Sequence, residues 1–537
     1  MADPAPHRRR AAAWATLCVA LVAAGLAARG GMLGFDGAEI YGHAWVQWWH
    51  ARALPAWPAG PDGLLPGIPV WPVIDWVPTA LGAALGRLGG LTFGWNLTWL
   101  VAFAMAALGG AAVARRAGGD PAVGAVALCL APALQGAAAS GLTEDAFVGV
   151  AALALALVGH RDLRLAAAGG ALLGLTAWFG LVLAWCAGLC ALALGGVLLT
   201  RDRGRWRGLL LGAAAAALTA APVALTHATR LTGRGHRMGT VALRDEPLWQ
   251  LNPWRGADLL SLVTPGRVDV GDALIRMHPG YLGLALLGLA AWGGRSRWWA
   301  PLLLMVALAP GLHLAAAGHP LGIDNPVVAA LQLLPLGDLL NHHARALLLA
   351  AVALAALASR GAARLPTPLR AIAPLVVLLD LALMSPIGLP LPTTASPALQ
   401  VNNCQPDGAG GPLHAERGAR CLSDLPDGLA LHLPLAGPGV PFQRALLHQT
   451  AHGRPILLNP NQPGLPPAFA ATPTGRWLSG LAFTPAPPPP GAVALPPSLR
   501  VVIAEAPFID AVAAGLGPPD VRAADSAAWA VGGSPRD

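Results

Sequence analysis

The chain has 537 residues, of which 55% are hydrophobic and 12% are charged, and its mean hydropathy is +0.55. Soluble globular proteins carry roughly 25% charged residues, so this composition excludes an ordinary soluble domain and predicts a chain that lies mostly in a bilayer. The net charge of +8 rests on arginine alone, because the sequence has no lysine. The arginines form short clusters between apolar runs, which indicates orientation in a membrane and argues against a nucleic-acid partner.

Apolar runs recur along the first 387 residues, and most approach the roughly 17–25 residues that a membrane-spanning helix needs. The first run follows the basic sequence MADPAPHRRR, and we expect it to remain as an uncleaved helix rather than a removed signal peptide. We therefore predict an α-helical polytopic membrane protein with about eleven spans, at 11–29, 93–114, 121–140, 145–159, 164–180, 181–200, 207–225, 280–294, 298–316, 344–359 and 368–387.

The segment 73–90 is moderately apolar but carries Asp75 and Arg87. If it does not cross the bilayer, the short basic clusters, including RDRGRWR at 201–207, all fall on the side of the N-terminus. Cytoplasmic loops are rich in Arg and Lys. We therefore expect 73–90 to lie in the interface or to re-enter, with the N-terminus in the cytoplasm and the C-terminal tail outside.

The first outer loop, 30–92, contains GFDGAEIYGHAWVQWWHARAL. Asp36, Glu39 and His43 follow one another at helical spacings of three and four, so they share one face of a helix. The tryptophans of the same stretch suit an amphipathic helix at the level of the lipid headgroups: Trp45, Trp48 and Trp49. The stretch is therefore either an interfacial anchor with solvated acids or a functional acidic site.

A second acidic motif, SGLTEDAFVG, places Glu144 and Asp145 at the start of a span on the same side. These acids either complement the helix dipole, or bind a divalent cation such as Mg²⁺ or Mn²⁺ through oxygen ligands, or act as a general base on a sugar hydroxyl. Outer arginines either bind a lipid phosphate or contact headgroups without a catalytic role. They are Arg230, Arg234, Arg237, Arg255 and Arg345.

The tail 388–537 is polar and rich in Pro and Gly, and its strand-like runs LALHLPL and LRVVIAEA predict a small extracytoplasmic α/β domain. Cys404 and Cys421 form a disulfide in an oxidising compartment, or they are two free thiols. The motif HQTAHGRP contacts substrate or forms a structural turn, and its polar residues are His448, His452 and Arg454.

The order of these features resembles the GT-C superfamily of multi-pass membrane glycosyltransferases, and most closely a bacterial branch of YfhO-like and dolichyl-phosphate-mannose-type proteins. The likeness rests on FDGAEIYGHAWVQWWHARAL after the first span, ALCLAPALQGAAASGLTEDAFVGVAAL, and LPLGDLLNHHARALLLAAVALAALASRG. Where relatives often have a more basic R-x-P-x-R pattern, only Arg345 carries over. The resemblance covers most of the chain, as a transmembrane domain at 1–387 and an extracytoplasmic domain at 388–537.

The resemblance implies an inverting transfer of a hexose from a polyprenyl-phosphate-linked donor to a glycan, lipid or protein acceptor, outside the cytoplasmic (inner) membrane of a bacterium. Asp36 corresponds to the family's acid in the first outer loop, as the base or a metal contact, and Glu144 and Asp145 to the second acidic motif. Many relatives have two adjacent acids in the first loop, whereas here Glu39 stands apart from Asp36. That difference leaves open a metal-independent enzyme or a member without catalysis.

Two other functions compete with this reading. A transporter or lipid flippase needs charged or broken helices inside the bilayer and an internal repeat. Asp380 is the clear carboxylate inside an expected span, and no convincing repeat is visible. A non-catalytic relative would act as an assembly scaffold with a docking domain outside the membrane.

Overall fold

The computed structural model of the chain describes residues 5–35, 40–53, 75–232, 256–266, 279–333 and 343–394, with short stretches between 425 and 531. The chain is mostly helical and divides into two units. The first unit comprises 1–34, 74–81 and 96–393, and the second comprises 35–73, 82–95 and 394–537.

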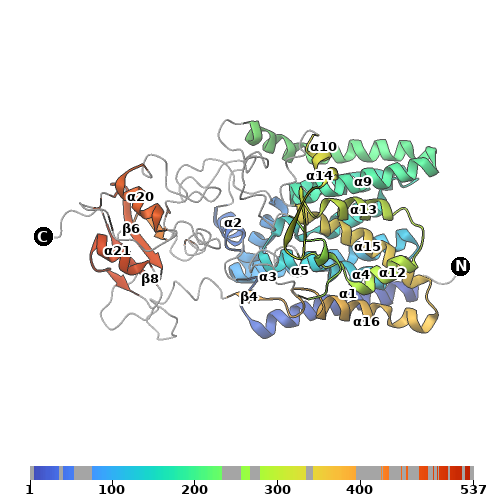
Figure 1. Cartoon of the computed structure of the whole chain (residues 1–537), viewed down its shortest axis with the longest axis horizontal. Coiled ribbons are helices and arrows are strands. Elements are labelled where there is room, and N and C mark those ends of the chain that lie inside the picture. The colour runs from blue at the N-terminus through green and yellow to red at the C-terminus, as the bar shows by residue number, and fades with distance from the viewer. Residues whose placement is uncertain are drawn as a thin grey trace. The chain divides into compact units, whose positions relative to one another are not determined.

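The first unit is a bundle of apolar helices that run alongside one another (Figure 1). Helix α8 packs against α9 and α10, and α15 packs against α4, α12 and α13. The helices are α1 (Ala5–Arg29), α3 (Trp76–Ala117), α4 (Pro121–Cys129), α5 (Pro132–Ser140), α6 (Thr143–Ala146), α7 (Val148–Leu157), α8 (Leu163–Phe179), α9 (Leu181–Arg201), α10 (Trp206–Thr232), α12 (Leu284–Trp292), α13 (Trp299–Leu308), α14 (Pro326–Gln332), α15 (Ala346–Ala363) and α16 (Thr367–Leu383).

Every expected span contains a helix, and within the described residues six helical stretches are long and apolar enough to cross a membrane. They are Arg8–Arg29, Trp76–Ala117, Pro121–Ser140, Leu181–Arg201, Arg203–Thr226 and His343–Ala363. The other expected spans fall on shorter helices, so the count of about eleven stays a prediction. Pro132 interrupts the stretch Pro121–Ser140, because α4 ends at Cys129 and α5 begins at Pro132.

The expected span 298–316 is wrong over its second half. Helix α13 ends at Leu308, and the chain continues as strand β2 (His313–Ala316), which pairs antiparallel with β3 (His319–Asp324). Gly311 has φ of 81°, a backbone conformation that side chains with a Cβ rarely adopt, so it ends the helical path before the hairpin. The apolar pattern hid this change because an Ala- and Leu-rich run suits a buried helix or a strand equally well.

Helix α3 confirms that the segment near 73–90 is helical and separate from the following span, because Gly90 has non-helical torsions of φ 84° and ψ 171°. A Cβ on Gly94 would lie 2.4 Å from the carbonyl oxygen of Gly82 and 2.6 Å from the backbone nitrogen of Gly86. The two parts of α3 therefore meet backbone to backbone, an approach that only glycine permits. Whether the first part lies in a membrane interface stays a prediction.

The second unit contains a four-stranded sheet in the order β5-β6-β8-β7. Strands β5 (Leu429–Leu433) and β6 (Leu499–Glu505) are parallel and confirm the two predicted strand runs, while β8 (Ser526–Ala530) is antiparallel to β6 and to β7 (Val521–Arg522). Helices α20 (Pro473–Gly480) and α21 (Ile509–Leu516) contribute to the apolar core of the sheet. The short strands β1 (Met32–Leu33), which belongs to the first unit, and β4 (Thr393–Thr394), where the first unit ends, form a separate pair.

Helix α2 (Ile40–Ala53), also in the second unit, carries the tryptophans that we expected at the lipid headgroups. Trp45 and Trp49 are only 1% and 4% exposed, and their rings stack at a centroid distance of 6.0 Å. The indole N–H of Trp45 donates to the side-chain oxygen of Gln449 at 2.7 Å. These two rings therefore pack inside the protein, and the expectation of a headgroup anchor is wrong for them.

Candidate functional site

The second acidic motif forms a buried turn of helix in the first unit. Gly141 ends α5 with φ of 78°, the left-handed conformation common after a helix C-terminus, and the chain then enters α6. Thr143, Glu144 and Asp145 are all buried there, with Asp145 fully so. Gly180, just before α9, permits this packing, because a Cβ on it would lie 2.3 Å from the carbonyl oxygen of Glu144.

Arg345 holds both acids of this motif. It lies in the 3-10 turn His343–Arg345 that precedes α15, and its side chain is 7% exposed. Its Nη2 donates to Oε1 of Glu144 at 2.7 Å, and its Nε lies 3.3 Å from Oδ2 of Asp145. A buried guanidinium between two carboxylates is a strong, oriented interaction, because desolvation raises the electrostatic cost of losing any partner.

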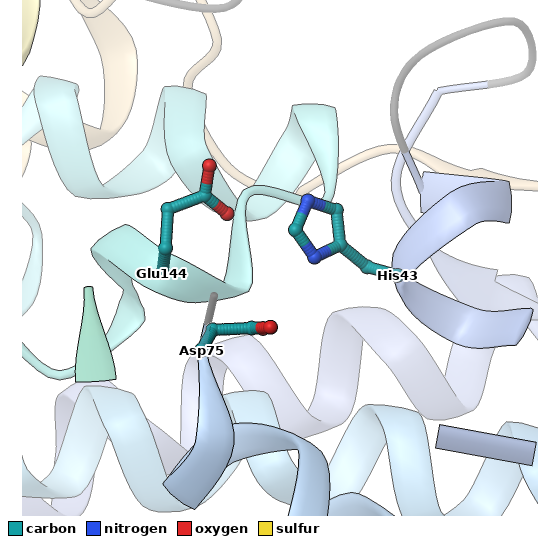
Figure 2. A group of neighbouring side chains, drawn as sticks. All are labelled: His43, Asp75 and Glu144. Carbon is teal, nitrogen blue, oxygen red and sulfur yellow. The ribbon is translucent and has the colours of Figure 1, made fainter. Parts of the chain in front are cut away.

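A third carboxylate, Asp75, adjoins this group (Figure 2). It precedes the first residue of α3 and is 2% exposed. Its carboxylate accepts hydrogen bonds from the hydroxyls of Thr143 and Thr79. An oxygen of Asp75 lies within 4.8 Å of an oxygen of Glu144. Asp75, Glu144, Asp145 and Arg345 are called the acidic site below.

The acidic site groups three carboxylates and one guanidinium, all of them buried. Buried charged groups are costly unless they are paired. Carboxylate oxygens accept hydrogen bonds and bind cations, so the site suits a ligand that brings positive charge or several hydrogen-bond donors. A divalent metal ion is one such ligand, and the hydroxyl groups of a sugar are another.

The acidic site brings together three residues that the sequence predicted separately, Glu144, Asp145 and Arg345. Asp75 was missed as a site residue. The signal for Asp75 is an acid directly before the start of a helix, with proline nearby. The hydropathy pattern uses Asp75 only as evidence that the segment 73–90 does not span the membrane. The remaining predicted site residues lie outside the described part of the chain, or outside its described side chains: Asp36, Glu39, Arg230, Arg234, Arg237, Arg255, Cys404, Cys421, His448, His452 and Arg454.

His43 is the third side chain drawn in Figure 2 and belongs to α2 in the second unit. It is half-buried on its helix. On the same helix, the pKa of His50 is lowered by burial and by the positive charge of Arg87. The protonated, positively charged form of His50 is therefore disfavoured on this helix.

Asp380, the carboxylate that the transport reading depended on, has a structural explanation in the first unit. Its Oδ1 accepts the hydroxyl of Tyr281 at 2.5 Å, and its Oδ2 accepts the backbone N–H of Ala285 at 2.9 Å, in the first turn of α12. Asp380 therefore ties α16 to the start of α12, as an acid at a helix N-terminus commonly does.

Comparison with family models and with curated proteins gives no match. Among solved structures, the arabinofuranosyltransferase AftD from Mycobacteria is 17% identical over 93% of this chain and 35% of that chain, with a TM-score of 0.47. ArnT from Cupriavidus metallidurans in the apo state is 15% identical over 97% of this chain and 98% of that chain, with a TM-score of 0.43. ArnT bound to undecaprenyl phosphate is 17% identical over 67% and 62%, with a TM-score of 0.38. This chain spans about a third of the length of AftD.

Proposed function

We propose that this chain is a GT-C-type membrane glycosyltransferase that moves a sugar from a polyprenyl-phosphate-linked donor to an acceptor hydroxyl. The observation that carries the proposal is the acidic site at one end of an apolar helix bundle, in which Arg345 pairs with Glu144 and Asp145, and Asp75 lies beside Glu144. Costly buried carboxylates in a membrane protein indicate a functional site. The donor class comes from the sequence resemblance.

The reaction needs one base and a stable leaving group. A carboxylate takes the proton of the acceptor hydroxyl, the acceptor oxygen forms a bond to the anomeric carbon, and the bond from that carbon to the phosphate oxygen breaks. The polyprenyl phosphate leaves with the bonding electrons and needs little acid assistance. A single displacement of this kind inverts the anomeric centre.

Two carboxylates are candidates for the base. Asp36 is the candidate from the sequence resemblance, and Asp75 is the candidate from the acidic site. Two threonine hydroxyls orient the carboxylate of Asp75, and Arg345 holds Glu144 and Asp145. Because Arg345 already has two carboxylate partners, we assign its first role to orienting the acids, and the donor phosphate to the arginines at 230–255.

A divalent cation fits the same residues. Asp75 and Glu144 offer carboxylate oxygens within 4.8 Å of each other. Hard cations such as Mg²⁺ prefer oxygen ligands. When bound, such an ion would neutralise charge on the departing phosphate.

The two ends of α9 and α15 support the proposed membrane orientation. Both helices begin at the acidic site and end in arginines, at Arg201 and in the last turn of α15 at Arg360. They have 21 and 18 residues, so the two ends are about 30 Å apart, the thickness of a hydrocarbon core. Arginine-rich ends face the cytoplasm, so we place the acidic site outside the inner membrane.

The test is transfer of radiolabelled sugar from a panel of polyprenyl-phosphate sugars by the full chain in lipid. Wild type is compared with Asp36→Ala and Asp75→Asn, and the matched control is Asp202→Asn, which removes a carboxylate at the opposite helix ends. We expect transfer by wild type and by the control, and loss in the variant that lacks the base. A parallel assay with EDTA, followed by added Mg²⁺ or Mn²⁺, tests the cation.

Two outcomes would replace the proposal. A folded wild-type protein that transfers no sugar from any donor would favour the non-catalytic scaffold. Movement of the donor lipid across the bilayer without transfer would favour a flippase. Asp380 does not support the second outcome, because Tyr281 and Ala285 bind its two oxygens.

A further inference from the structure

A second charged site lies in the first unit, at the far ends of the helices that begin at the acidic site. Arg201 is the last residue of α9, and Arg360 lies in the last turn of α15. Arg116 lies in the last turn of α3, Arg205 in the 3-10 turn Arg203–Arg205, and Arg297 just before α13. These five residues are called the arginine cluster.

Three members of the cluster donate hydrogen bonds to backbone carbonyls. Arg297 donates from Nη2 to the carbonyl of Arg116 at 3.1 Å. Arg360 donates from Nε to the carbonyl of Gly293 at 3.2 Å, and Arg205 donates from Nη1 to the carbonyl of Gly159 at 2.8 Å. Such bonds complete helix C-termini and explain part of the arginine content.

The bonds to backbone carbonyls do not use all of the N–H donors of the cluster. A guanidinium has five N–H donors in a planar fork, and each of these carbonyls takes one. In the described part of the chain, Nη2 of Arg116 is buried and has no hydrogen-bond partner. A buried donor without a partner costs free energy comparable to a lost hydrogen bond, so a ligand with several acceptor oxygens would relieve it.

The charge balance points to an anion. Burial and, after it, the positive charges of the four other members lower the pKa of Arg297 to about 10. The nearby carboxylate of Asp202 is shared between Arg161 and Arg205. The helix C-termini add only about half a negative charge each, so positive charge remains in excess.

Exposed tryptophans next to the cluster indicate that lipid lies beside it. Trp206 follows Arg205 directly and is 50% exposed, and Trp292 precedes Gly293 and is 62% exposed. Tryptophan at the end of an apolar helix typically lies at the membrane interface, at the depth of the phosphate groups. The arginine cluster and these rings therefore adjoin the place where a phospholipid head group would lie.

We propose that the arginine cluster is a binding site for the phosphate group of an anionic ligand, and that this ligand is an anionic phospholipid of the adjacent leaflet. Arg116 and Arg297 are half-buried members of the cluster, and Arg201 is its exposed member. A phosphate offers several acceptor oxygens to planar guanidinium forks. The site is independent of the proposed transfer reaction.

The test measures binding of short-chain phosphatidylglycerol to the full chain in neutral detergent, with short-chain phosphatidylcholine and inorganic phosphate as the other probes. The variants are Arg297→Gln and Arg116→Gln. The matched control is Arg203→Gln, which removes an exposed arginine at the same end of the helices. Arg201→Gln gives a surface variant of the cluster if a half-buried substitution prevents folding, and thermal melting checks each protein.

We expect phosphatidylglycerol to bind more tightly than phosphatidylcholine, and each cluster variant to weaken it about tenfold, since one charge-assisted bond is worth about that factor. The control should change the affinity less than about twofold, as expected for a screened surface charge. Equal weakening by Arg203→Gln, or full affinity in all cluster variants, overturns the proposal. Inorganic phosphate that binds as tightly as phosphatidylglycerol supports the anion site but identifies a soluble phosphate as its ligand.

Discussion

The two ends of α9 and α15 differ in the ratio of arginines to carboxylates. At the acidic site, one arginine, Arg345, binds two buried carboxylates, Glu144 and Asp145. At the other end, two carboxylates are each bound by two arginines: Arg10 and Arg370 bind Asp120, and Arg161 and Arg205 bind Asp202.

The two ends therefore differ both in charge composition and in burial. The acidic end has more carboxylates than arginines in a buried setting, where an ion pair cannot be lost without a large cost. The arginine end carries excess positive charge in a half-exposed setting, where solvent screens each pair. We therefore expect substitutions at the acidic end to have the larger effects.

The largest effect is expected for Arg345→Met, which leaves Glu144 and Asp145 buried without their guanidinium. We expect a loss of about 3–5 kcal/mol in the free energy of unfolding, the usual cost of removing one partner of a buried pair. Denaturant titration of the full chain in detergent measures it. The matched control, Arg360→Met at the other end of α15, should cost about 1 kcal/mol or less. Equal losses would contradict the comparison.

The next largest effect, a loss of about a hundredfold in the rate of sugar transfer, is expected for Asp75→Asn under the proposed function. The amide keeps the shape of the carboxylate but cannot take a proton, and general-base catalysis typically contributes at least about a hundredfold. Initial rates of sugar transfer measure the effect, and Asp202→Asn should leave the rate unchanged. Full activity in Asp75→Asn would remove Asp75 from the candidates and leave Asp36.

A moderate effect is expected for Asp120→Asn at the arginine end. The side chain of Asp120 is 2% exposed, but its partners Arg10 and Arg370 are each 29% exposed. Its Oδ1 also accepts the backbone N–H of Ala122 at the start of α4, and an amide oxygen can keep that bond. We expect a loss of roughly 1–2 kcal/mol in the free energy of unfolding. A loss as large as that of Arg345→Met would show that partial exposure does not screen these pairs.

The smallest effect is expected for Asp202→Asn, and it should depend on pH. Hydrogen bonds and positive charge from Arg161 and Arg205 lower the pKa of Asp202 below its ordinary value of 3.8. A lowered pKa in the folded protein stabilises it above the ordinary value, and the contribution is lost as the pH falls through the lowered value. The melting temperatures of wild type and variant should thus differ slightly at neutral pH and converge below about pH 4. A difference that grows in acid would reverse the sign of the linkage.

Much of the fold could be predicted from local patterns. The apolar runs gave a helix within every expected span, and alternating strand runs gave β5 and β6. The apolar pattern failed at 309–316, where the residues form a turn and strand β2 instead of continuing helix α13. It also failed for Trp45 and Trp49, since hydropathy does not distinguish a ring that faces lipid from one that packs on protein.

The sequence by itself determined that the chain is an apolar helical protein, that arginines gather at one set of helix ends, and that Glu144 and Asp145 form an acidic motif. These properties are local, because helix periodicity and charge clusters extend over a few neighbouring residues. Only the tertiary structure decided that Arg345, 201 residues away, binds Glu144, and that Asp75, 68 residues before Thr143, accepts its hydroxyl. Such pairs depend on which helix ends pack together, and no short stretch of sequence encodes that choice.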